Sequence, residues 1–305
     1  MNKYGIHLAN GAQDIQRIVS CGFTHYLALE MQVDYLAQCP GERYLRLWNK
    51  PGDDAIDIAD GIRDYLGITT DIIPWNEANI ETDLSYAEIA ACFNEVCDVI
   101  DGDVTLHWPA LSPSRYYQAY VAHWLPAAER ADVVDVHCYG TCEEMLEIVD
   151  WYRRVLPGKP LLITEFNFGA GRQVDPNWWA QEALRFYAAL YERPEVMAAC
   201  GFIWKWYNPD IALPTTVDWQ DQPIEAVVRA ALKTDVGGVT MSLRDQFPEL
   251  FSQWEAAGGV DNNFRSHLLA VGALKPTKDD VRFLAEELNS KAQQIINVVN
   301  ALPFA

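Results

Sequence analysis

The sequence predicts an α/β fold, a (β/α)8 TIM barrel followed by a small C-terminal helical appendage. Short apolar runs recur through residues 1–235, and a segment with helical spacing of apolar residues follows each run. The runs are apolar along almost their whole length, as expected for parallel strands that are buried on both faces. Eight alternating strand and helix units in about 235 residues match the size and order of such a barrel.

The predicted strands can be located individually. An open doubly wound sheet is the structural alternative, but it would normally place a glycine-rich phosphate turn after its first strand, and residues 8–12 read Leu-Ala-Asn-Gly-Ala. The predicted strands are Tyr4–Ala9, His25–Leu29, Arg43–Trp48, Thr70–Trp75, Val104–Trp108, Val133–Tyr139, Pro160–Phe168 and Cys200–Tyr207.

Three segments between these strands carry the clearest helical pattern. Residues 87–100 have apolar side chains at i, i+3 and i+4, and Ser85 with Glu88 three positions later is typical of a capped helix start. Residues 143–156 and 178–191 show the same spacing. The spacing therefore predicts helices on the outside of the barrel.

The pattern changes after Lys233. Residues 234–240 read as a linker, so we expect a catalytic barrel over 1–235 and a C-terminal helical region over 241–305. The last predicted helix has an apolar stripe, which either docks on the barrel or allows self-association with a second chain. The helices expected in this region are 243–256, 263–271 and 278–302.

Composition excludes several classes of partner. The formal net charge of −20 makes nucleic acid a poor ligand, because phosphate binding needs clustered Lys and Arg, and it also disfavours anionic membrane surfaces. No run of 18 apolar residues is present. The 11 Trp and 14 Tyr are more than core packing usually needs, and flat aromatic faces can stack on sugar rings.

The cysteines and the first residues suggest a compartment. The seven cysteines are an odd number, and several fall within apolar patterns, so we expect buried free thiols in a reducing environment. No apolar segment of a secretory signal follows Lys3. We therefore expect a cytoplasmic protein, while release as a signal-less or phage-encoded lysin remains an alternative.

Most of the predicted strands end in ionisable or aromatic residues. A barrel of this kind builds its active site at the C-terminal ends of its strands, so these residues are the candidates for chemistry. They are Arg46, Trp48 and Asn49; Trp75, Asn76 and Glu77; His107 and Trp108; His137 and Tyr139; Glu165; and Trp204, Lys205 and Trp206.

Two glutamates are the centre of this set. Alternation along the seventh strand places Glu165 on the same side as Ile163, and alternation along the fourth places Glu77 on the same side as Trp75. We take both sides to face the barrel interior. Asn76 then points the other way unless a bulge turns it inward.

A facing pair of carboxyl groups has a specific chemical use. Hydrolysis of a glycosidic bond needs one protonated acid for the leaving oxygen and one ionised carboxylate for the anomeric carbon. Two neighbouring carboxyl groups also push their pKa values apart, so that one can be protonated while the other is charged. The pair therefore predicts a glycoside hydrolase.

Four short motifs resemble one family. The segments WNEAN at the fourth strand, HCYG at the sixth, ITEFNFG at the seventh and FIWKWYN at the eighth are similar to the clan A glycoside hydrolases. These are retaining β-glycosidases built on a (β/α)8 barrel, and the resemblance covers residues 1–235. It implies cleavage of a carbohydrate substrate by two glutamates, without a metal or other cofactor.

The resemblance also implies roles for individual residues. Glu77 would be the acid/base and Glu165 the nucleophile, while Asn76 would bind the sugar 2-hydroxyl. Tyr139 would hydrogen-bond the nucleophile, with His137 nearby.

Further substrate-binding residues follow from the same resemblance. Arg46 would support the nucleophile, and His107 occupies the position of a histidine on strand five of some members. Trp204 or Trp206 would form the floor under the reacting sugar, and Trp75 helps to fix the aromatic turn that carries the acid.

Two other functions remain open at this point. His7, His107 and His137 on three strands, with Asp210 after the eighth, could form a metal-dependent barrel hydrolase. The chain could also be a non-catalytic glycan-binding barrel, although the presence of both carboxylates argues against this.

Overall fold

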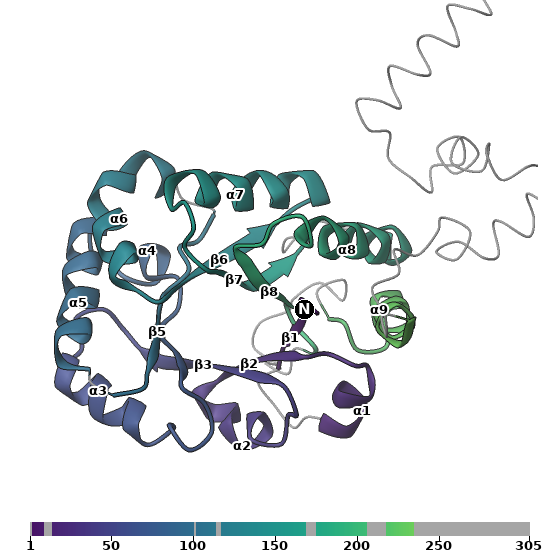
Figure 1. Cartoon of the computed structure of the whole chain (residues 1–305), viewed down its shortest axis with the longest axis horizontal. Coiled ribbons are helices and arrows are strands. Elements are labelled where there is room, and N and C mark those ends of the chain that lie inside the picture. The colour runs from purple at the N-terminus through teal and green to yellow at the C-terminus, as the bar shows by residue number, and fades with distance from the viewer. Residues whose placement is uncertain are drawn as a thin grey trace, which may run out of the picture. The chain divides into compact units, whose positions relative to one another are not determined.

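The structure is a computed structural model of the 305-residue chain, and it describes residues 2–8, 14–100, 102–113, 117–168, 175–205 and 218–234. Eight parallel strands close into one barrel, in which each strand pairs with the next and β8 pairs with β1 (Figure 1). The predicted (β/α)8 fold is confirmed for this part of the chain. The strands are β1 (Tyr4–His7), β2 (His25–Leu29), β3 (Glu42–Asn49), β4 (Asp71–Trp75), β5 (Thr105–Trp108), β6 (Val133–Tyr139), β7 (Leu161–Asn167) and β8 (Val196–Gly201).

Helices surround the strands (Figure 1). The predicted N-cap of α5 is present, because the Ser85 hydroxyl accepts from the Glu88 backbone and the Glu88 carboxylate accepts from the Ser85 backbone. The helices are α1 (Ile15–Ser20), α2 (Val33–Leu36), α3 (Ala55–Arg63), α4 (Ala78–Glu81), α5 (Tyr86–Val99), α6 (Val121–Arg130), α7 (Cys142–Val155), α8 (Pro176–Leu190) and α9 (Pro223–Thr234), with 3-10 turns η1 (Glu30–Gln32) and η2 (Tyr117–Tyr120).

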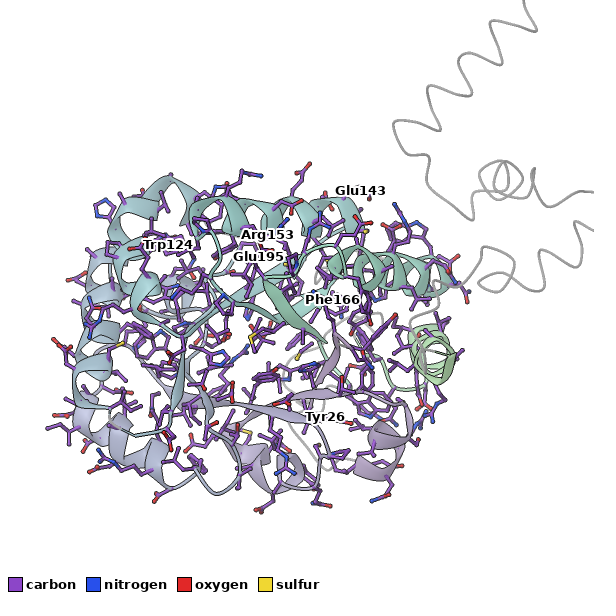
Figure 2. The ribbon with its side chains drawn as sticks, viewed as in Figure 1. Tyr26, Trp124, Glu143, Arg153, Phe166 and Glu195 are labelled. Carbon is purple, nitrogen blue, oxygen red and sulfur yellow. The ribbon has the colours of Figure 1, made fainter. Side chains whose placement is uncertain are left out.

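Buried apolar side chains form two groups, one inside the barrel and one between strands and helices. The larger, outer group contains Trp124 and Phe166, which lie on different sides of the barrel in Figure 2. Trp124 stacks on Trp108 with ring centroids 6.1 Å apart. The smaller, interior group is Leu27, Tyr44, Ile73, Val133, Leu162, Ala198 and Cys200. Membership of one group or the other shows which way a strand residue faces.

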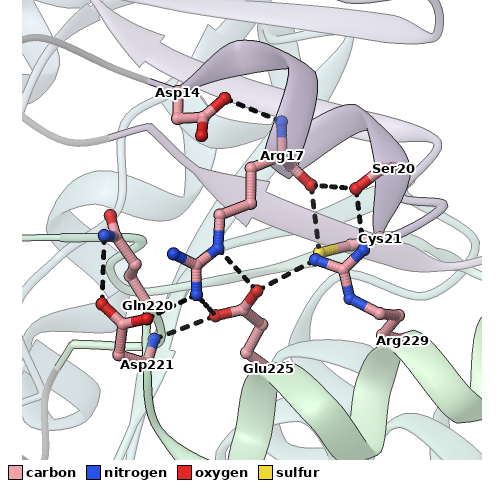
Figure 3. A network of polar contacts seen from close by, with 8 residues as sticks. All are labelled: Asp14, Arg17, Ser20, Cys21, Gln220, Asp221, Glu225 and Arg229. Carbon is pink, nitrogen blue, oxygen red and sulfur yellow. Dashed lines mark hydrogen bonds and ion pairs between the residues drawn. The ribbon is translucent and has the colours of Figure 1, made fainter.

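A network of charged side chains joins α9 to α1 (Figure 3). Arg17 on α1 donates from Nε to Glu225 Oε1 at 2.8 Å and from Nη2 to Glu225 Oε2 at 2.6 Å. Arg17 Nη2 also reaches Asp221, and Arg229 donates to Glu225 at 2.9 Å. The last described helix is therefore attached to the first helix of the chain.

The structure corrects the position of the eighth strand. We predicted it over Cys200–Tyr207, but β8 ends at Gly201 and begins at Val196. Residues Ala198–Cys200 are small, which made the strand less visible in the sequence than the aromatic run that follows it.

Two other expectations concern the helices predicted at the end of the chain and the absence of a segment that could span a membrane. The predicted helical region over 241–305, and the division near residue 235, lie outside the described residues and stay predictions. Within the part of the chain that the structure describes, no helix is long and apolar enough to cross a membrane.

Candidate active site

The two predicted catalytic glutamates lie on either side of one imidazole. His137 on β6 places Nδ1 2.6 Å from Oε1 of Glu77, which directly follows β4. Its Nε2 is 3.6 Å from Oε1 of Glu165 on β7. The fourth, sixth and seventh strands therefore bring Glu77, His137 and Glu165 together, as the sequence predicted.

Arg46 and Tyr139 hold the carboxylate of Glu165. Arg46 Nη1 on β3 donates to Glu165 Oε1 at 2.5 Å, and the Tyr139 hydroxyl donates to Oε2. The Glu165 residue is only 6% exposed. Burial alone would raise its pKa, but nearby His137 and Arg46 outweigh burial and lower the pKa to about 2. Glu165 is therefore ionised at neutral pH.

The hydrogen bonds also fix the tautomer of His137. Arg46 Nη2 lies 3.2 Å from His137 Nε2, and because a guanidinium can only donate, Nε2 must accept. Nδ1 carries a proton, which it donates to Glu77. One imidazole thus connects the cation that holds Glu165 to the second carboxyl group.

The two glutamates have different surroundings. Glu165 receives hydrogen bonds from a guanidinium and a phenol, whereas Glu77 receives one from His137 and its side chain is 13% exposed. Donors that stabilise the ionised form are concentrated on Glu165. The surroundings of Glu165 therefore favour its ionised form more strongly than those of Glu77 do.

The structure corrects the strand alternation that we used to place Glu165. Ile163 does not face the barrel interior; it belongs to the outer group, and Leu162 lies inside. The pairing of β6 and β7 shifts between Val136↔Ile163 and His137↔Glu165, so Thr164 is an extra residue on β7. This bulge turns Glu165 inward.

A similar irregularity occurs at β4. Ile73 lies inside the barrel, but Trp75 faces outward and packs edge-on against Phe93 on α5, with ring centroids 6.1 Å apart. The register between β3 and β4 shifts just before Trp75. Trp75, which we expected to face the pocket, is a core residue that is 1% exposed.

Asn76 lies beside the acid, as its sequence position requires. Its Nδ2 donates to Glu81 Oε1 at 2.6 Å, and its Oδ1 is buried with no hydrogen-bond partner among the described residues. The hydrogen bond to Glu81 directs the amide group of Asn76 toward α4.

His107 is not part of this site. Its Nδ1 is 2.8 Å from Asp135 Oδ1 and its Nε2 is 3.4 Å from Asp71 Oδ1, and the side chain is fully buried. Burial lowers its pKa, but the two aspartates outweigh burial and raise the pKa to about 9. Both ring nitrogens are engaged, so His107 has no exposed atom to offer a sugar.

Trp204 is also placed elsewhere than expected. Its side chain is completely buried in the outer group, and the Arg17 guanidinium lies 5.9 Å from the centroid of its ring. An indole covered in this way offers no face to a substrate. Trp206 lies outside the described residues.

The sequence did not assign His7 to the glycosidase site. His7 at the end of β1 is 1% exposed, and its Nδ1 lies 2.7 Å from the carbonyl of Leu8, so Nδ1 donates and Nε2 is a buried acceptor without a partner. Burial, together with nearby Arg46, lowers its pKa to about 4, while Glu165 acts in the opposite direction. The position of His7 at the end of a predicted strand could have marked it as a residue of the glycosidase site. We had considered His7 only as a metal ligand.

The residues proposed for a metal-dependent hydrolase do not form one cluster. His107 is bound to aspartates, whereas His137 is bound to glutamates. Among the residues that the structure describes, no group of three or more His, Cys, Asp or Glu side chains could hold a metal ion. Asp210 lies outside them.

Part of the chain matches a known family model. Residues 46–195 match the family model described as glycosyl hydrolase catalytic core. The matched segment begins at Arg46 and contains Glu77, His137, Tyr139 and Glu165. No curated protein sequence matches the chain.

Several solved structures share the fold. One is an endo-β-1,3-glucanase of subgroup I of family GH128 from Amycolatopsis mediterranei, with 15% identity and a TM-score of 0.56 over 75% of this chain and 99% of that one. An exo-β-1,3-glucanase of subgroup VI from Aureobasidium namibiae has 13% identity and a TM-score of 0.53 over 72% and 90%.

A β-glucuronidase from Ruminococcus gnavus has 11% identity and a TM-score of 0.51, over 76% of this chain and 49% of that one. These likenesses establish the barrel. The family match covers the segment that carries the two glutamates, so the chain is similar to the glycosyl hydrolase catalytic core over residues 46–195.

Proposed function

We propose that the chain hydrolyses β-glucosidic bonds with retention of anomeric configuration, through a covalent intermediate on Glu165. The observation that carries this proposal is the pair of carboxyl groups on either side of His137, one held as an anion by Arg46 and Tyr139 and the other held only by the imidazole. A retaining mechanism needs this division of roles.

In the first step, Glu77 donates a proton to the leaving oxygen while Glu165 attacks the anomeric carbon. The Nδ1–H of His137 stabilises the carboxylate that forms on Glu77. In the second step, Glu77 takes a proton from water, and the water displaces Glu165. For this mechanism we expect the two carboxyl groups to be about 5–5.5 Å apart, whereas inversion would need about 6.5–9.5 Å.

We propose a β-1,3-glucan or its oligosaccharides as the substrate. The similar GH128 proteins are described as β-1,3-glucanases, and several of their structures contain laminarioligosaccharides. Some of these structures have a glutamate replaced by glutamine or alanine. The strongly negative charge of this chain also favours a neutral glycan over an acidic one.

The test is hydrolysis of a glycan panel by the purified full chain, with the anomer of the first product followed by NMR. We expect cleavage of β-1,3-gluco-oligosaccharides and initial release of the β-anomer. Initial release of the α-anomer would show inversion, and no cleavage of any β-glucan would contradict the substrate.

We further propose that the protein works in a reducing compartment such as the cytoplasm. The seven cysteines are all free, and five of them are buried. Thiols of this kind are typical of proteins that are kept reduced. Retention of activity and melting temperature under millimolar thiol, with loss of either on mild oxidation, would support the proposal; full tolerance of oxidant would contradict it.

A further inference from the structure

Trp48 at the end of β3 is the most exposed large apolar side chain of the described residues. It is 64% exposed, whereas most other tryptophans of the barrel are almost completely buried. A large aromatic ring left in water is informative when it lies beside a functional site. The buried tryptophans are Trp75, Trp108, Trp124, Trp179, Trp204 and Trp219.

Trp48 follows Arg46 by two residues on β3, toward the end of the strand where the carboxyl pair lies. Tyr44 belongs to the interior group and Arg46 contacts Glu165, so the inner face of this strand carries every second residue. The register with β4 shifts between Arg46 and Asn49, but Leu47 belongs to the outer group and Asn49 pairs with Trp75, which faces outward, so we assign Trp48 between them to the inner side. It lies about 6.6 Å further along the strand than Arg46, toward the C-terminal rim.

The backbone that carries Trp48 is fixed. The Trp48 amide donates to Glu30 Oε2 at 3.2 Å, and Tyr65 donates its hydroxyl to Glu30 Oε1 at 2.7 Å. Glu30 directly follows β2, so its carboxylate links the ends of β2 and β3 to the segment after α3. A fixed backbone reduces the conformational freedom that is lost when the residue binds a ligand.

The indole ring of Trp48 and its position on β3 both favour a sugar ring as the ligand. An indole face offers a flat apolar surface, and the C–H face of a pyranose ring offers a matching one. The side chain lies beyond the residues that hold the nucleophile, so it would contact a neighbouring sugar of the chain and not the sugar at the reacting bond. We propose that Trp48 is the stacking platform of a second sugar-binding subsite.

This inference rests on the proposed function, because it takes a glucan chain as the substrate. It adds a specificity: the enzyme should prefer oligosaccharides long enough to reach Trp48. The platform acts through binding of a distal sugar and takes no part in proton transfer or in attack on the anomeric carbon.

The experiment measures kcat/KM for β-1,3-gluco-oligosaccharides of two to six units in the full chain, for wild type, Trp48→Ala and Trp48→Phe. We expect the loss in Trp48→Ala to grow with chain length and to reach roughly tenfold for the longest oligosaccharides. Trp48→Phe should lose less, because a smaller ring remains. Tyr191→Ala is the matched control, since Tyr191 is an exposed aromatic at the end of α8, on the opposite face of the barrel.

A second measurement separates binding from chemistry. In the Glu165→Gln background, Trp48→Ala should weaken binding of the hexasaccharide by a similar factor in calorimetry. An equal loss at every chain length, or no loss in either assay, would overturn the subsite. If the wild-type protein cleaves no β-glucan at all, the proposed function fails and the subsite fails with it.

Discussion

Glu165 and Glu77 differ in their partners, and this difference predicts different effects of their removal. Glu165→Ala should abolish turnover, and added azide should restore part of it with inverted product, because a small anion can occupy the place of the missing nucleophile. Glu77→Ala should slow substrates with poor leaving groups most, because a good leaving group needs little protonation. Rates on a series of aryl glucosides and on oligosaccharides would measure both effects.

A buried glutamate outside the site provides the control. Glu182 is 2% exposed and forms an ion pair with Arg185, so Glu182→Gln tests the cost of changing a buried carboxylate without touching the chemistry. It should keep the wild-type kcat even if its melting temperature falls. Wild-type rates for both alanine variants would show that the carboxyl pair is structural.

A second prediction for a single residue concerns the effect of Tyr139 on the pH dependence of kcat/KM. Glu165 must be ionised to attack, and its pKa is lowered to about 2, so protonation of Glu165 should reduce kcat/KM only below about pH 3. Tyr139→Phe removes a donor that favours the ionised form, so its acidic limb should move to higher pH. A hydrogen bond to a charged group is worth about 1.5–3 kcal/mol, and kcat/KM should fall by up to roughly 100-fold.

The measurement is the pH dependence of kcat/KM for wild type and Tyr139→Phe. Tyr152→Phe is a suitable comparison, because Tyr152 is a buried tyrosine on α7, within the outer apolar group. An acidic limb that does not move in Tyr139→Phe would mean that the phenol does not stabilise the nucleophile.

At the scale of strands, His107 ties β5 to β4 and β6 through Asp71 and Asp135. Its pKa is about 9 in the folded protein against an ordinary value of 6.5. The stabilisation is therefore fully present below pH 6.5 and is lost as pH rises through 9. The shift corresponds to about 3 kcal/mol, which is an upper value for a buried group.

The prediction is that the free energy of unfolding of wild type, relative to His107→Gln, falls between pH 6 and pH 9.5. Urea unfolding at a series of pH values would measure it. His25→Gln is the control, because the pKa of His25 is lowered by burial and its advantage should not decrease over this range. A constant difference between wild type and His107→Gln would mean that His107 is not charged.

The attachment of α9 to α1 gives a prediction at the scale of helices. Arg17→Ala should increase amide hydrogen exchange in α9, because Arg17 makes two hydrogen bonds to Glu225, a residue that is 8% exposed (Figure 3). Arg17 is about one third exposed, so solvent screening keeps the stabilisation to about 1 kcal/mol. A double-mutant cycle with Glu225→Ala measures the coupling, and a coupling near zero would contradict the attachment.

The strands and helices show what a sequence can and cannot predict about this fold. Seven of the predicted strands coincide with β1 to β7, and the cap of α5 is where Ser85 and Glu88 placed it. Periodicity and capping depend on neighbouring residues, so they are visible in the sequence. The eighth strand was predicted too far along the chain, because the aromatic run after residue 200 has a stronger strand pattern than the small residues of β8.

The site was predictable in its residue types but not in its orientation. The inward turn of Glu165 depends on an extra residue at Thr164, and the outward turn of Trp75 depends on a register shift before it. Such shifts arise from pairing between strands, which local alternation does not contain. His107 lies away from the carboxyl pair for the same reason, because the level of a strand residue in the barrel depends on register.

At the scale of the whole molecule, the last described helix completes the ring of elements around the barrel, and residues beyond it carry the predicted apolar stripe. β8 pairs with β1, and α9 is attached to α1, so residues 1–234 already contain a closed sheet with its flanking helices. We therefore expect a chain that ends at Thr234 to fold, to melt cooperatively and to keep the kcat of the full chain on a soluble oligosaccharide.

One substitution in the full chain then tests whether the apolar stripe of the predicted tail helix is buried. The predicted stripe of Val281, Leu284, Leu288 and Ile295 must be buried if the helix over 278–302 forms, and burying one such side chain is worth about 1.5–3 kcal/mol. If the stripe pairs two chains, Leu284→Asp should halve the mass measured by light scattering, and the truncated chain should also have the mass of its own monomer. If the stripe docks within one chain, the mass should stay constant while exchange in the tail increases. Unchanged mass together with unchanged exchange would show that these side chains are not buried at all.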